Sequence, residues 1–150
     1  MAELIEESDD RLVVRKWIPA PREEVFAAWG DAEGMRHWMC PSDILAAEAQ
    51  LDFRVGGAFR ILMKGPREDY DHTGVFQEID PPSKLSFTWI SKGTDFQTTL
   101  VTVELFERDG GTELILTHDR FPSADRVPQH SGGWRQIVDR LSQRSVANKQ

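Results

Sequence analysis

Residues 128–146 read PQHSGGWRQIVDRLSQRSV, and this stretch decides the fold class. Its apolar residues fall at i, i+3, i+4 and i+7, which is one face of an α-helix: Trp134, Ile137, Val138 and Leu141. Pro128 suits the first turn of such a helix, because its missing N–H costs nothing there. A helix of roughly 18 residues is about 27 Å long, which is enough to lie across a whole β-sheet.

The chain that precedes this helix is dominated by β-strand patterns. One strand is predicted at Arg11–Ile18, and two short helices follow at Pro21–Trp29 and Glu33–Met39. Six further strands are predicted where apolar and polar residues alternate, or where β-branched and aromatic residues are enriched: near Ala47–Val55, Ala58–Lys64, His72–Ile79, Lys84–Ser91, Thr98–Arg108 and Thr112–His118. Short connectors join them, and Asp109-Gly110 is the strongest hairpin signal among these. The predicted fold class is therefore α+β, with a curved antiparallel sheet of six or seven strands wrapped around one long C-terminal helix.

Length, composition and charge limit the class of protein. The 150 residues fit one domain, and 39% hydrophobic with 29% charged residues is ordinary globular composition. The formal net charge is -7, so the surface repels phosphate backbones and anionic membranes, and we expect neither nucleic-acid nor membrane binding. Residues 1–10 are acidic and polar and are expected to be disordered, with a single domain over 11–150.

The same survey argues against a metal, a cofactor and an export signal. The single Cys40 and the scattered histidines show no short ligand spacing, and the glycine pairs Gly56-Gly57 and Gly110-Gly111 lack phosphate-loop context. We therefore expect no metal and no cofactor. The N-terminus has no signal-peptide pattern and no apolar run reaches 18 residues, so a cytoplasmic location is expected.

A series of short motifs along residues 11–145 indicates a family. The motifs follow one another in this order: Ala20-Pro21 before Val25-Phe26 and Trp29, Trp38 before Pro41, Arg54-Val55-Gly56-Gly57, Gly74, Glu78-Ile79-Asp80-Pro81-Pro82 before Leu85, Phe87-Thr88-Trp89, Gly111-Thr112, Leu114–His118, and Gly133-Trp134 with Leu141. Their order resembles the helix-grip fold of the START/Bet v 1-like superfamily. The motifs are similar to its branch related to the activator of Hsp90 ATPase, also described as polyketide cyclase/dehydrase-like. That branch holds binding proteins, enzymes and co-chaperone domains, so the resemblance implies the fold more than the function.

A curved sheet pressed on a long helix by bulky aromatic residues tends to leave a cavity, and apolar side chains with a few polar groups usually line such a pocket. Candidate ligand-binding residues come from the inward strand faces, the short helices and the long helix: Trp38, Met63, Phe76, Trp89, His118, Phe121 and Trp134. In the helix-grip arrangement these regions converge at the cavity end that ligands reach.

Four polar residues bear on the chemistry of this cavity. His118 ends an apolar-alternating strand and is interpreted either as a ligand contact or general base, or as a satisfied structural histidine. Glu78 is the second titratable candidate, because it shares strand parity with inward-facing Phe76. His72 is expected in a solvent-exposed turn, and His130 either faces the cavity or lies on the helix surface.

Three functions remain open on the sequence. The first is binding of a small hydrophobic or aromatic molecule in the cavity, and the second is a cyclase- or hydrolase-type enzyme using the same cavity. The third is a co-chaperone-like interaction domain, which predicts a large exposed apolar patch. Homodimer formation through an open sheet edge is left open.

Overall fold

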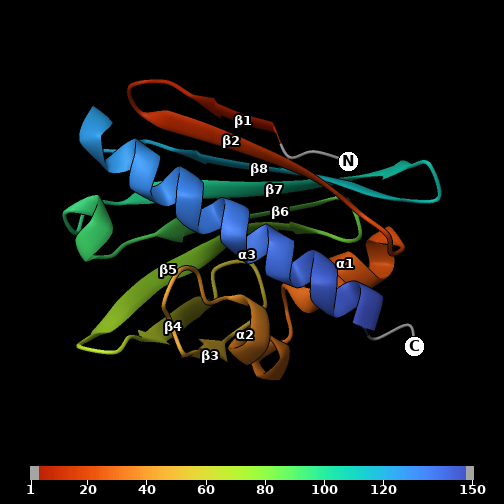
Figure 1. Ribbon diagram of the computed structural model, residues 1–150, viewed down its shortest axis with the longest axis horizontal. Coiled ribbons are helices and arrows are strands. Elements are labelled where there is room, and N and C mark those ends of the chain that lie inside the picture. The colour runs from red at the N-terminus through yellow and green to blue at the C-terminus, as the bar shows by residue number, and fades with distance from the viewer. Residues whose placement is uncertain (1–3, 148–150) are drawn as a thin grey trace.

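The computed structural model describes residues 4–147 as one antiparallel sheet of eight strands, crossed on one face by a long helix (Figure 1). The strands are β1 Leu4–Glu7, β2 Arg11–Ile18, β3 Ala46–Leu51, β4 Ala58–Lys64, β5 Asp69–Asp80, β6 Lys84–Trp89, β7 Thr99–Arg108 and β8 Gly111–Asp119. The helices are α1 Arg22–Ala28, α2 Ala32–Trp38, the 3-10 turns η1 Lys92–Thr94 and η2 Ala124–Arg126, and α3 Val127–Ala147. The α+β helix-grip architecture predicted from the sequence is confirmed.

The sheet order is β1-β2-β8-β7-β6-β5-β4-β3. The strands from β3 to β8 pair in chain order, as short hairpin connectors dictate, and β2 closes onto β8. The helices α1 and α2 follow β2, and α2 contacts β3 at the far edge of the sheet. The chain therefore wraps both edges of the sheet around α3.

The expectation of a disordered N-terminus is wrong for the described part of that segment. Leu4–Glu7 form β1, which pairs with β2 so that Ile5 lies opposite Val14. Ile5 is half-buried against the core, and Glu6 lies 3.7 Å from Arg15. Two adjacent apolar residues followed by acidic ones carry too weak a strand signal, and the strand forms because β2 offers it an edge. Residues 1–3 of the expected disordered segment lie outside the described residues.

A β-bulge in β5 changes which side chains face the core. Phe76 lies opposite Phe87, and Glu78 lies opposite Ser86. Gln77 is therefore an extra residue in β5 without a partner position in β6. An extra residue reverses the alternation of side chains beyond it. His72 and Phe76 are buried, whereas Glu78 is exposed and lies 3.3 Å from Lys84. The prediction that Glu78 shares the inward face is therefore wrong.

The core lies between the inner face of the sheet and the apolar stripe of α3. The stripe residues predicted from the helical period are all buried: Trp134, Ile137, Val138 and Leu141. Among the described residues, none of the helices is long and apolar enough to cross a membrane.

Candidate functional site

A cavity of about 470 Å³ lies between α3 and the sheet, at the end that holds η1 and η2. This volume is within the range of small-molecule pockets. Its buried wall is mainly apolar and aromatic: Met63, His72, Trp89, Ser91, Trp134 and Ile137. The strands β4, β5 and β6 supply one side of this wall and α3 supplies the other.

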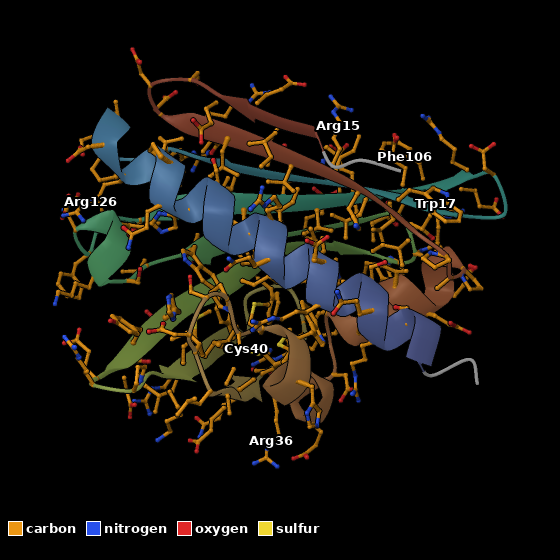
Figure 2. The ribbon with its side chains drawn as sticks, in the orientation of Figure 1. Arg15, Trp17, Arg36, Cys40, Phe106 and Arg126 are labelled. Atoms are coloured by element: carbon orange, nitrogen blue, oxygen red, sulfur yellow. The ribbon has the colours of Figure 1, made fainter. Side chains whose placement is uncertain are left out.

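The rim of the cavity is polar and carries both signs of charge. Lys92 lies 3.5 Å from Glu68, and Arg126 forms an ion pair with Asp95. Arg126 marks this end of the molecule in Figure 2, and Trp17 lies at the opposite end. Because both rim cations are already paired, the entrance offers no free positive charge at these two residues.

Three of the predicted ligand-binding residues line the cavity, namely Met63, Trp89 and Trp134. The indoles of Trp89 and Trp134 lie against each other, with ring centroids 5.0 Å apart. The sequence identified these residues because strand parity and helical period each predict an inward direction.

The other four predicted residues are buried in the core and do not line the cavity. Trp38 packs edge-on against Trp29 with ring centroids 5.0 Å apart, and Phe76 packs against Phe59 with ring centroids 5.4 Å apart. The ring centroids of Phe121 and His118 are 4.2 Å apart, behind the cavity wall. Parity predicts that a side chain points inward, but it does not distinguish a filled core from an open cavity.

His118 is wholly buried and has a partner at each ring nitrogen. The Trp134 Nε1–H donates to Nδ1 at 3.0 Å, so Nδ1 carries no proton. The neutral ring then has its proton on Nε2, which donates to Thr99 Oγ1 at 2.7 Å. The Thr99 hydroxyl in turn donates to the Trp89 carbonyl at 2.5 Å.

This chain of hydrogen bonds joins the two tryptophans of the cavity wall through the core. Burial lowers the pKa of His118 well below its ordinary value, and nearby His130 lowers it further. His118 is therefore neutral at pH 7 and positions Trp134. This arrangement fits the structural interpretation of His118, and the hypothesis of a direct ligand contact does not fit it.

His72 is buried in the cavity wall, so the expectation of an exposed turn is wrong. Its Nδ1 lies 3.2 Å from the Ile61 carbonyl, and its ring packs on Trp89 with centroids 4.8 Å apart. Burial is the main cause that lowers the pKa of His72, to about 4. Its shared strand parity with buried Gly74 and Phe76 is the sequence signal that indicates an inward direction.

His130 faces the cavity from the first turn of α3. Its Nδ1 lies 2.8 Å from the Arg126 carbonyl, and burial lowers its pKa. A Cβ built on Gly93 would lie 2.9 Å from His130 Cε1 and 3.1 Å from Nε2. The His130 ring therefore fills the space that the missing side chain of Gly93 leaves.

The Trp89 ring in the cavity wall also carries a buried hydrogen-bond donor without a partner. The Trp89 side chain is 2% exposed, and its Nε1 has no hydrogen-bond partner among the described residues. This nitrogen has almost no accessible surface, so a molecule in the cavity contacts the Trp89 ring and not its N–H. Within residues 4–147, no three or more His, Cys, Asp or Glu side chains are grouped so as to hold a metal ion.

Comparison with known families gives a match over most of the chain. The family described as activator of Hsp90 ATPase homolog 1-like protein matches residues 19–145. The chain belongs to this family. The whole cavity wall, from Pro41 to Ile137, lies inside the matched range. A comparison with curated proteins finds no match.

Several solved structures share the fold of this family member. A Rhodobacter sphaeroides protein is 21% identical with a TM-score of 0.82, covering 97% of this chain and 99% of the other. CalU16 from Micromonospora echinospora is 23% identical with a TM-score of 0.74, covering 95% of this chain and 85% of the other. An Hsp90 activator from Plasmodium falciparum is 23% identical with a TM-score of 0.70, covering 87% and 91% respectively. At these identities the likeness establishes the helix-grip fold of this chain but not its function. The site of this chain must therefore be interpreted from its own residues.

Proposed function

We propose that the protein binds a small aromatic or apolar molecule in the cavity between α3 and the sheet. The observation that carries this proposal is the cavity of about 470 Å³, walled by Met63, Trp89, Trp134 and Ile137. Apolar walls with a few convergent polar groups are typical of small-molecule sites. The family fold is consistent with a ligand-binding domain.

Two neighbouring glycines of α3 allow a matched test of this proposal. Gly133 lines the cavity, and a Cβ built on it would make ordinary contacts with Pro41 at 3.8 and 3.9 Å. Gly132 does not line the cavity, and a Cβ there would meet nothing within 4 Å. Neither glycine is therefore needed for a close approach of the helix to the sheet, and either position accepts a Cβ atom.

The experiment compares Gly133→Leu with Gly132→Leu. Replacing a helical glycine stabilises the helix by up to about 1 kcal/mol in either variant, so both are expected to fold. Only the leucine at position 133 enters the cavity. The neutral fluorophore N-phenyl-1-naphthylamine should bind saturably to the wild type and Gly132→Leu, and at least tenfold more weakly to Gly133→Leu. Equal binding by all three proteins, or none by the wild type, would overturn the proposed function.

The positions of Glu78 and His118 do not support the enzymatic alternative, for which these two residues were the candidate acid or base. Glu78 is exposed, and both ring nitrogens of His118 are hydrogen-bonded inside the core. Neither can act as a general acid or base on a molecule in the cavity, because such a group must reach the proton that it transfers. Homodimer formation stays a prediction, with β1 and β3 as the outermost strands and light scattering as its test.

A further inference from the structure

His130 lines the cavity, and its contact with the Arg126 carbonyl uses only Nδ1, so no other described residue hydrogen-bonds its Nε2. Whether Nε2 donates or accepts depends on the protonation state of the ring, because a histidine nitrogen can play either role.

The contact of His130 with the backbone decides that role. Its Nδ1 lies 2.8 Å from the Arg126 carbonyl, which can only accept, so Nδ1 carries the proton. Burial favours the neutral ring by lowering its pKa. A neutral imidazole has one N–H, so Nε2 presents a lone pair and acts as an acceptor.

The charges around the cavity do not favour an anionic ligand. Lys92 is paired with Glu68, and Arg126 with Asp95. Asp71 also lines the cavity and is paired with Arg60 at 2.9 Å, whereas Asp43 lines it without an ion pair to another described residue. A carboxylate transferred into this site would therefore lack a free cationic partner and would face the Asp43 carboxylate.

We infer that the ligand is a non-anionic aromatic molecule bearing a hydroxyl or equivalent group that donates to His130 Nε2. The aromatic part packs on the indoles of Trp89 and Trp134. This inference rests on the proposed function and adds the chemical class of the ligand. It excludes anionic ligands such as free fatty acids as preferred occupants.

Three naphthalenes of similar size test the class by displacement of N-phenyl-1-naphthylamine at pH 7.5. The probe 2-naphthol is uncharged and has both a donor and an acceptor, 2-methoxynaphthalene has only an acceptor, and 2-naphthoate is an anion. A net hydrogen bond of roughly 0.5–1.5 kcal/mol corresponds to about three- to tenfold in affinity. The wild type should therefore bind 2-naphthol about three- to tenfold more tightly than 2-methoxynaphthalene, and 2-naphthoate more weakly than both.

Two histidine variants complete the test. His130→Phe removes the acceptor and should abolish the preference for 2-naphthol over 2-methoxynaphthalene. His37→Phe changes an exposed histidine of α2 and should keep it. Equal affinity of the wild type for 2-naphthol and 2-methoxynaphthalene, or tightest binding of 2-naphthoate, would overturn this inference while the proposed function stands. Failure of the fluorophore itself to bind would overturn the proposed function.

Discussion

Replacing Thr99 by valine tests the hydrogen-bond chain that positions both tryptophans of the cavity wall. Valine keeps the shape of threonine but removes the hydroxyl that accepts from His118 Nε2 and donates to the Trp89 carbonyl. Both the imidazole N–H and the carbonyl then lose a partner in a wholly buried site. Each orphaned buried group costs roughly 1–3 kcal/mol, so Thr99→Val should lower the free energy of unfolding by about 2–6 kcal/mol.

Thr112→Val is the matched control, because Thr112 is also wholly buried and donates to the Ala20 carbonyl at 2.7 Å. It leaves one carbonyl unpaired but no imidazole, so by the same rule it should cost about 1–3 kcal/mol. Urea denaturation at pH 7.5, followed by tryptophan fluorescence, gives both values. If Thr99→Val costs no more than Thr112→Val, the hydrogen bond between His118 and Thr99 makes no net contribution and the argument fails.

Three further predictions concern the same cavity wall. The pKa of His72 is lowered to about 4 in the folded chain, so between about pH 6.5 and pH 4 this residue is protonated in the unfolded chain but not in the folded one. Stability should therefore fall between pH 6.5 and 4, by about 3 kcal/mol for this residue, and His72→Phe should flatten that slope in urea titrations; an unchanged slope would contradict the assignment. Gly93→Ala places a methyl group 2.9 Å from His130 Cε1, so the ring must move. The preference for 2-naphthol should then shrink in the displacement assay, and an intact preference would show that the ring position is irrelevant. Trp134→Ala should cost roughly 3–5 kcal/mol in urea denaturation, because the ring is buried; a loss below about 1 kcal/mol would place it outside the core.

The fold could be predicted because each element has a strong local period. The helical spacing from Trp134 to Leu141 predicted α3 to within one residue at its start, and alternation predicted Arg11–Ile18 and Ala58–Lys64 with their observed bounds. The strand at Leu4–Glu7 was missed because its stability comes from pairing with β2. The bulge at Gln77 was missed because one extra residue leaves no signal in composition, yet it turns Glu78 away from the core.

The candidate site was less predictable because it depends on contacts between distant segments. Parity identified Met63 and Trp89, but whether an inward residue lines a cavity is decided by packing against α3. The sequence left open whether His118 contacts a ligand or is satisfied within the core, and only the approach of Trp134 and Thr99 shows that its nitrogens are occupied. His130 lines the cavity because Gly93, 37 residues earlier in the sequence, leaves room for its ring.

The most direct test of ligand binding is a titration of ¹⁵N-labelled protein with 2-naphthol, followed through the indole N–H signals. The signals of Trp89 and Trp134 should shift saturably, since both rings line the cavity. Trp17 should not shift, because its indole donates to the Arg108 carbonyl at 2.8 Å at the opposite end of the molecule (Figure 2). The shifts should vanish in Gly133→Leu and persist in Gly132→Leu. Unmoved Trp89 and Trp134 signals at saturating 2-naphthol, or equal shifts in both glycine variants, would contradict binding in the cavity.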